Sequence, residues 1–242
     1  MRKLLTLWIA LAAIVAVTAS SFAGSMMLMG VGKAPAASGG TPAYTYLASP
    51  AWAQFPGTSA TFSGVSIGSQ ASGSYTIVAV EMTNAYDASM AVTVGGVSAV
   101  ATDSIKELWY ALTPAGGTGS IVVNNGATSI NTVGIQVAQI TNIATLGTPH
   151  NNAAYGPFSG AITMGSVAVP TNGIAVVTDL LSSTNNGTTP TTSGFTVDHV
   201  SVDSGTTSEM LIGHTTTTGT ISPTITIPSP ISATAAVAVF SP

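Results

Sequence analysis

The stretch from Tyr75 to Ile140 constrains the fold more than any other part of the sequence. It is a succession of short segments rich in Val, Ile and Thr, separated by Gly, Asn and Pro. Alternation with a period of two, bounded by turn residues, indicates half-buried antiparallel strands, and several in a row predict a sandwich or barrel. The segments are YTIVAVEM, VTVGGVSAVATDS, ELWYALTP, TGSIVVNN and TVGIQVAQI.

Two glycine-containing turns support this interpretation. Gly95-Gly96 separates two Val-rich runs, and such a pair supplies the positive φ angles that a two-residue hairpin turn requires. Asn125-Gly126 closes the strand at Ile121–Val123 in the same way.

A second group of strands is expected after a looser stretch, Asn142 to Gly160, which contains two prolines and two further asparagines. The polar run Ser182 to Gly194 is expected to be a loop projecting from one end. The strands expected in this group are Ile162–Val169, Gly173–Leu181, Phe195–Val202, Met210–Thr216, Thr220–Ile227 and Ala233–Phe240.

The sequence therefore predicts an all-β fold, an antiparallel two-sheet β-sandwich of the jelly-roll or immunoglobulin-like kind with about 10–12 strands. A hydrophobic segment precedes it. We expect residues 1–24 to be a signal peptide or membrane anchor, 25–43 an apolar segment with a Gly/Ser/Pro linker, and 44–242 a single sandwich domain.

Residues 1–24 contain two basic residues, an apolar run from Leu4 to about Ala19, and then small residues, as in a secretory signal. Cleavage after Ala23 or after Ala19 would fit the small-x-small rule. An uncleaved anchor is the alternative, although a spanning helix needs roughly 20 apolar residues. A start codon placed too far upstream is a third interpretation, because Met26 opens a second apolar stretch.

Composition excludes several classes of function. Only 5% of residues are charged while 45% are hydrophobic, so the chain is not a disordered one. Without residues 1–24, Lys33 and Lys106 would be the remaining cations, so nucleic-acid binding is not expected. The absence of Cys excludes disulfides, a thiolate nucleophile and Cys-based zinc sites. A polar surface with so few charges favours a secreted module or a subunit packed among others.

The chain resembles phage- and prophage-encoded β-sandwich structural proteins of the decoration, spike or tail-associated type. The resemblance begins with the apolar opening Met26–Gly32, which ends in Gly-x-Gly before a Gly/Ser/Pro-rich linker. It continues through four strand motifs and a self-contained apolar strand at the C-terminus. These are Tyr75–Met82, Val92–Val100, Glu107–Pro114, Thr118–Asn124 and Ala235–Pro242.

The sequence predicts no catalytic, cofactor-binding or metal-binding residues, and no cofactor is expected. Gly64–Gly68 matches G-x-S-x-G, but it lies in alternating β sequence rather than at a strand-to-helix turn, so a nucleophile elbow is not expected. The histidines, His150, His199 and His214, lack the spacing of a zinc pair. Asp198 and His199 are neighbours, which in a regular strand point to opposite faces.

Carboxylates and aromatic residues leave two open alternatives. Asp179, Asp198, Asp203 and Glu209 would converge if their strand ends met at one rim, as a glycoside hydrolase requires. Aromatic rings either fill the core and subunit contacts or form a glycan platform. The rings concerned are Trp109 and Tyr110 in a strand, and Tyr44, Tyr46, Trp52, Phe55, Tyr86, Tyr155 and Phe158 in loops or near the linker.

We therefore expect a non-enzymatic structural component of a phage or phage-like particle, a virion or extracellular protein that contacts other subunits or a host surface. Homo-oligomers are expected, because edge strands with few charges are poorly guarded against pairing. The alternative is a secreted bacterial adhesin or carbohydrate-binding module, which the signal-like N-terminus and the Thr/Asn-rich loops favour. A depolymerase-like enzyme is a third option and would need clustered carboxylates.

Overall fold

The computed structural model describes residues 40–82, 86–102, 105–146, 150–182, 191–203 and 208–242. Within these ranges the regular elements are all β-strands, and every strand pairing is antiparallel. The predicted all-β antiparallel fold is confirmed. No helix among the described residues is long and apolar enough to cross a membrane.

The first half of the described chain forms two sheets, which we call sheets A and B. Sheet A has the strand order β1-β10-β4-β8-β7, with β2 also pairing β10, and sheet B has the order β3-β9-β5-β6. Sheet A comprises β1 (Ala43–Ala48), β2 (Ala53–Gly57), β4 (Tyr75–Met82), β7 (Val100–Ala101), β8 (Leu108–Leu112) and β10 (Ile130–Thr141). Sheet B comprises β3 (Ser59–Gly68), β5 (Ala91–Val94), β6 (Val97–Ser98) and β9 (Gly117–Asn124).

The second half forms sheets C and D. Sheet C has the order β11-β19-β14-β17-β16, with β12 and β15 also pairing β19, and sheet D is the pair β13-β18. Sheet C comprises β11 (Thr145–Leu146), β12 (His150–Thr163), β14 (Ile174–Ser182), β15 (Thr191–Ser193), β16 (Thr196–Val202), β17 (Glu209–Thr215) and β19 (Thr224–Ser241). Sheet D comprises β13 (Val167–Val169) and β18 (Gly219–Ile221).

Each half has its own hydrophobic core. Val78 and Val80 of β4 point toward sheet B, where Ile121 and Val123 of β9 belong to the same buried cluster. In the second half, Val177 of β14 packs with the odd-numbered residues from Ala233 to Val239 of β19 against sheet D and the adjoining end of β12. This alternation follows from the pleat of a strand, in which successive side chains point to opposite faces.

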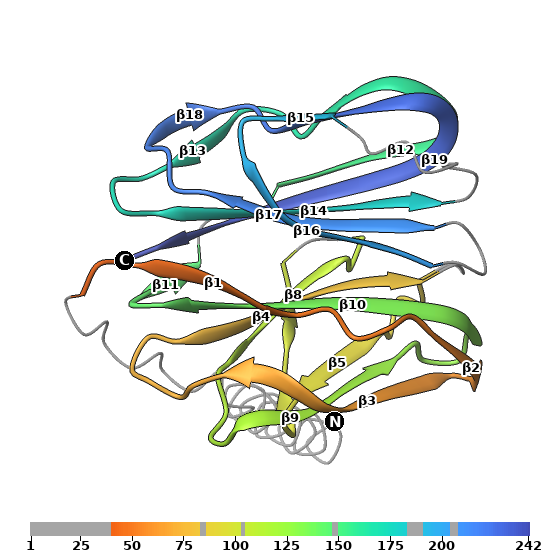
Figure 1. The fold of residues 1–242 in the computed structure, drawn as a ribbon, viewed down its shortest axis with the longest axis horizontal. Helices are drawn as coiled ribbons and strands as arrows, with labels where there is room; N and C mark the ends of the chain where they lie inside the picture. The colour runs from red at the N-terminus through yellow and green to blue at the C-terminus, as the bar shows by residue number, and fades with distance from the viewer. Residues whose placement is uncertain (1–39, 83–85, 103–104, 147–149, 183–190, 204–207) are drawn as a thin grey trace, which may run out of the picture. The chain divides into compact units, whose positions relative to one another are not determined.

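Sheets A and C face each other, so the layers follow the order B, A, C and D (Figure 1). The Gln136 side chain of β10 donates from Nε2 to the carbonyl oxygen of Met210 in β17, at 3.0 Å. The Tyr44 ring of β1 stacks on His214 of β17. Both halves belong to one compact unit, residues 35–242.

This stacking explains where the fold differs from the sequence prediction. Four sheets and nineteen strands occur among the described residues, instead of two sheets and about 10–12 strands. All eight residues of β4 are buried, because one face meets sheet B and the other meets sheet C. A strand buried on both faces lacks the alternation of apolar and polar residues that marks a half-buried strand. Its sequence therefore does not show that a further sheet covers its second face. Asn142 to Gly160 is also not loose throughout, since it contains β11 and the start of β12.

The predicted hairpin at Gly95-Gly96 is confirmed. Val94 pairs with Val97, and the φ angles of the two glycines are 54° and 84°. Gly126 likewise has a φ of 62° at the Asn125-Gly126 turn. All of residues 1–24 and most of residues 25–43 lie outside the described residues, so the predicted segment boundaries stay predictions.

Replacing Ile121 by Ala should lower the free energy of unfolding by about 2–5 kcal/mol, because the fully buried side chain would leave a cavity between sheets A and B. Val100→Ala is the control, since Val100 is 44% exposed and its truncation should change that free energy by less than about 0.5 kcal/mol. Urea denaturation measures both. Equal losses in the two variants would contradict the proposed core.

Candidate functional site

Four of the seven acidic residues within the described ranges are buried, and they lie where sheets A and C meet. Glu81 belongs to β4 and Glu107 directly precedes β8, whereas Asp179 belongs to β14 and Glu209 begins β17. None of the four is more than 3% exposed. We call these residues the buried acidic cluster.

Burial dominates the electrostatics of this cluster. It raises the pKa of Glu81 well above the ordinary value, and the charges of Asp179 and then Glu107 add to the effect. Burial also raises the pKa of Asp179, followed by the charge of Glu209. The two carboxylate oxygens of Glu81 have no hydrogen-bond partner among the described residues. The surroundings of Glu81 and Asp179 therefore favour the neutral carboxylic acid over the carboxylate.

Polar contacts across the interface hold sheets A and C in register around the cluster. Thr234 of β19 donates its hydroxyl to Oε1 of Glu107, and both residues are buried. Gln136 Nε2 donates to Ser201 Oγ of β16 at 3.2 Å, as well as to the Met210 carbonyl. Hydrogen bonds of this kind offset part of the cost of burying polar groups.

The structure separates the four carboxylates for which the sequence left convergence at one rim as an open alternative. Asp179 and Glu209 are brought together, but in the buried interface rather than at an open edge. Asp198 contacts His214 instead, and Asp203 lines a surface cleft described below. Sequence reasoning missed Glu81 and Glu107. The available signal for Glu81 was a charged residue in the apolar strand YTIVAVEM, where a buried acid is unusual unless another layer covers it.

Two aromatic stacks lie on the same side of sheet A. The rings of Tyr44 and His214 are 4.1 Å apart with an interplanar angle of 14°, and those of Tyr46 and His199 are 5.0 Å apart at 17°. Asp198 holds the first histidine, with Oδ2 at 2.8 Å from Nδ1. Burial, followed by the charge of Asp198, raises the pKa of Tyr44. These contacts give both histidines a structural role between β1 and sheet C.

Strand β16 is irregular between Val197 and His199, where its register with β17 shifts. A bulge inserts a residue and re-aims the side chains that follow it. The simple alternation expected for Asp198 and His199 therefore does not apply there. Asp198 reaches the histidine on the neighbouring strand β17, while His199 stacks on Tyr46 of β1.

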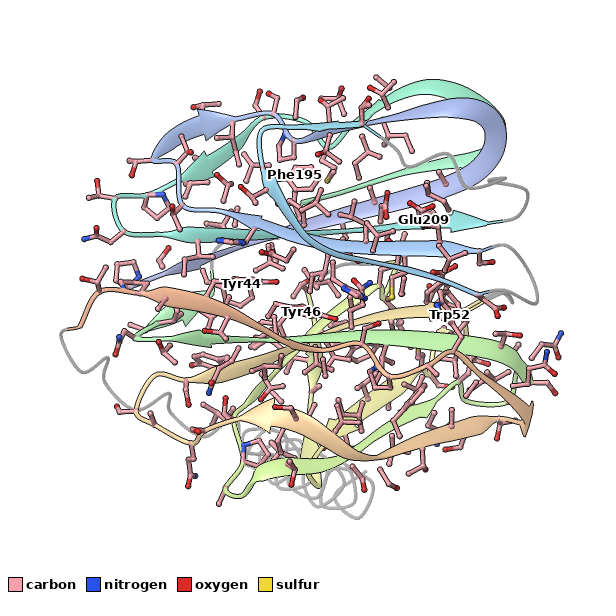
Figure 2. All side chains as sticks on the ribbon, viewed as in Figure 1. Tyr44, Tyr46, Trp52, Phe195 and Glu209 are labelled. Carbon is pink, nitrogen blue, oxygen red and sulfur yellow. The ribbon has the colours of Figure 1, made fainter. Side chains whose placement is uncertain are left out.

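A cleft of about 260 Å³ lies between β16 and the segment that joins β1 to β2. Figure 2 shows Trp52 between the two, at the edge of sheet A. The residues that line the cleft are Ser49, Pro50, Ala51, Trp52, His199, Ser201, Val202 and Asp203.

Sequence explains why the edge of sheet A opens at this point. Strands β1 and β2 both pair with β10, but Ala48 pairs with Val137 and the pairing resumes only at Ala53 with Val133. Pro50 lies in the gap, and proline cannot donate to a strand ladder. The segment between β1 and β2 therefore does not pair with β10, but the ring of Trp52 in this segment packs on Gly134 of β10.

Gly134 makes room for that indole. A Cβ built on Gly134 would lie 2.8–2.9 Å from three ring atoms of Trp52. Such a contact is too short for any ordinary packing, so glycine is the residue that allows the ring to approach the strand. Gly134 also pairs with Glu81, which places the Trp52 ring beside the buried acidic cluster.

The cleft carries little charge. Asp203 is the one acidic residue in the lining, and the lining contains neither Lys nor Arg. Burial lowers the pKa of His199, which favours its neutral imidazole. The other polar groups are the hydroxyls of Ser49 and Ser201.

Trp109, Tyr110 and the Gly64–Gly68 motif, which the sequence also singled out, all lie within strands. Trp109 is buried and its indole N–H donates to the Lys106 carbonyl at 2.8 Å, while Tyr110 is half-buried and packs edge-on to Tyr75 and Phe240. Gly64–Gly68 forms part of β3, which pairs with β9, so no nucleophile elbow occurs there. No cluster of three metal-ligating side chains occurs among the described residues. The side chains of His150, Phe55, Tyr155 and Phe158 lie outside the described part.

No protein-family model matches the chain, and no curated protein matches it. Among solved structures, a conserved protein of unknown function from Pseudomonas aeruginosa PAO1 is 12% identical, covering 84% of this chain and 92% of that one with a TM-score of 0.28. The major capsid protein P2 of bacteriophage PM2 is 8% identical, over 83% and 97%, with a TM-score of 0.27. A turret protein of Sulfolobus turreted icosahedral virus is 12% identical, over 82% and 98%, with a TM-score of 0.18. TM-scores this low carry no argument about function.

The buried acidic cluster should make the protein less stable as the pH rises. Because the pKa of Glu81 is higher in the folded chain than the usual value near 4.3, the folded chain binds more protons between the two values. The free energy of unfolding then falls as the pH rises through that window. Glu81→Gln should raise the urea midpoint at neutral pH and leave it nearly unchanged below about pH 4.

Asp87→Asn is the matched control and should act in the opposite direction. Hydrogen bonds from the side chain and main chain of Ser89, and from Thr128, lower the pKa of Asp87 to about 2. Its carboxylate therefore stabilises the fold above the unfolded pKa near 3.9, and this contribution is lost as the pH falls toward about 2. A Glu81→Gln variant that is less stable than the parent at neutral pH would contradict the account of the cluster.

Gly134→Ala should displace the Trp52 ring and lower the free energy of unfolding by about 1–3 kcal/mol. Gly57→Ala in β2 is the control, since a Cβ there would meet no atom within 4 Å. Urea denaturation measures the costs, and tryptophan fluorescence detects the displacement. Gly134→Ala should cost much less in a Trp52→Ala background. An equal cost in both backgrounds would show that the ring is not what requires glycine.

Proposed function

We propose that this chain is a non-enzymatic structural component of a phage or phage-like particle, of the decoration, spike or tail-associated type, which acts through subunit or host-surface contacts. The single observation that carries the proposal is a surface with very few charged side chains, because the four residues of the buried acidic cluster do not reach it. Among the described residues, the charged side chains outside the cluster are Asp87, Lys106, Asp198 and Asp203. Asp198 pairs with His214, and the Lys106 ammonium donates to the carbonyls of Asp87 and Ala88.

The same surface has little exposed apolar area. Val100 and Val202 are the exposed large hydrophobic residues among those described, and they lie on the edge strands β7 and β16. A surface of Thr, Ser, Asn, Gly and Ala has neither the charge that keeps proteins apart nor the apolar patch of an obligate dimer. Edge strands of this kind favour pairing with neighbouring subunits, including copies of the same chain.

The positions of the buried acidic cluster and of Asp198 support a non-catalytic role. General acid–base chemistry needs a carboxylate within hydrogen-bond reach of substrate. Glu81, Glu107, Asp179 and Glu209 are covered by sheets A and C, so a substrate at the surface would not reach them. Asp198 and His214 bind each other beneath Tyr44.

A secreted adhesin or carbohydrate-binding module is the second candidate, and the cleft beside Trp52 is the observation that favours it. An aromatic ring beside hydroxyl groups and a carboxylate is typical of a small-molecule site with a few placed polar groups. Both candidates are extracellular or particle-bound and neither needs a cofactor.

Mass spectrometry of purified particles and of culture supernatant, analysed in parallel, tests the proposal. We expect the chain to be recovered with the particles, with an N-terminus at Met1 or near Met26. Recovery only as a free protein that begins after Ala19 or Ala23 would overturn the particle assignment in favour of the secreted module. Stepwise salt washing of the particles controls for simple adherence, because a structural subunit stays bound.

A further inference from the structure

We propose that the cleft between Trp52 and β16 is a binding site for one ring of a neutral saccharide. This inference rests on the proposed function, for which it names the ligand class of the host-surface contact. The site lies at the edge of sheet A, where the ladder between β1 and β10 is interrupted.

The size of the cleft limits the ligand. At about 260 Å³ it is slightly smaller than the range of roughly 300–1,000 Å³ that is typical of sites for drug-sized ligands. The cleft therefore suits a single sugar ring, with the rest of a glycan extending into solvent. A peptide or a second sheet would need a longer groove.

Trp52 supplies an aromatic wall that is already in position. Its ring is fixed against Gly134, which leaves no space for movement toward β10. The indole N–H is buried, so it is not exposed to solvent in the cleft. A ring held in this manner loses little conformational entropy when a flat C–H face of a sugar packs on it.

The polar groups that line the cleft with Trp52 match the hydroxyls of a sugar. Asp203 supplies a carboxylate that accepts hydrogen bonds, and Ser49 and Ser201 supply hydroxyls that both donate and accept. Ser201 Oγ already accepts a hydrogen bond from Gln136 Nε2 at 3.2 Å, which leaves its O–H as a donor. The contact with Gln136 also ties this wall of the cleft to the interface between sheets A and C.

The charge of the cleft selects a neutral ligand. The lining has one acidic residue and no Lys or Arg, and Glu81 lies close enough for the charge of Asp203 to raise its pKa. An anionic sugar, phosphate or sulfate would meet repulsion with no compensating cation. A metal ion would need more ligands than the described residues bring together here.

Binding can be measured with the full-length protein and methyl glycosides of glucose, galactose, mannose and N-acetylglucosamine, using tryptophan fluorescence and calorimetry. A panel of larger neutral glycans and their sialylated or sulfated counterparts extends the search. We expect saturable binding of at least one neutral sugar, a change in the fluorescence of Trp52, and no binding of the anionic counterparts in preference to the neutral ones.

Two variants test the two walls of the cleft separately. Trp52→Ala and Asp203→Asn should each weaken binding by at least about tenfold, as expected for losing a stacking wall or a charge-assisted hydrogen bond. Trp52→Phe should retain part of the affinity, and Val100→Ala on the distant edge strand β7 should retain all of it. Thermal unfolding confirms that each variant is folded. Asp203→Asn preserves the shape of the cleft, so it keeps the test valid if Trp52→Ala unfolds.

Three outcomes would overturn the inference: no binding of any neutral glycan, binding that survives both Trp52→Ala and Asp203→Asn, or a preference for anionic glycans. None of these would affect recovery of the chain in particles. A chain found in particles that binds no sugar retains the proposed structural function and loses this site. A chain that binds sugar but occurs only in the supernatant is the secreted module instead.

Discussion

The contact between sheets A and C is the interaction on which the rest of the structure depends. Each sheet covers a hydrophobic core with one face, and the contact between them also removes the other face of each from water. That second contact buries Glu81, Glu107, Asp179 and Glu209 together with Gln136. Carboxyl groups in such a place are tolerable mainly in the neutral form, because an ionised group would lose its hydration without a compensating cation.

The same contact creates the candidate binding site. Pro50 interrupts the ladder at the edge of sheet A, and Gly134 allows Trp52 to close over the gap. The opposite wall comes from β16, the edge strand of sheet C. The cleft exists because two sandwiches are stacked, so neither half contains a complete site. Burying the acidic residues in this contact also leaves a surface with few charges, on which one carboxylate in a cleft becomes a distinctive feature.

Much of the fold could be predicted from the sequence. The Val-rich strands and the Gly95-Gly96 turn predicted antiparallel hairpins, and three strands of the second group, β14, β16 and β17, were placed within one or two residues. The other three were not: the strand predicted at Ile162–Val169 is the end of β12 followed by β13, and those predicted at Thr220–Ile227 and Ala233–Phe240 fall on β18 and the single long strand β19. The site could not be predicted to the same extent. Trp52 was one of nine aromatic candidates, and nothing local distinguished it, since its position depends on Gly134, which lies more than eighty residues away in the chain. The sequence left open whether Asp203 joins the other carboxylates, and the structure instead places it directly after β16, in the cleft beside Trp52.

The sequence by itself determined the strands, their turns and the all-β class, because these depend on neighbours within a few residues: alternation, β-branched side chains and glycines with positive φ. Only the tertiary structure decided that there are two sandwiches and that Glu81 and Asp179 share a buried interface. It also decided that Asp198 pairs with His214 rather than with another acid. Period-two alternation shows that a strand has two faces, but the sheet that covers each face is set by contacts between residues distant in the chain.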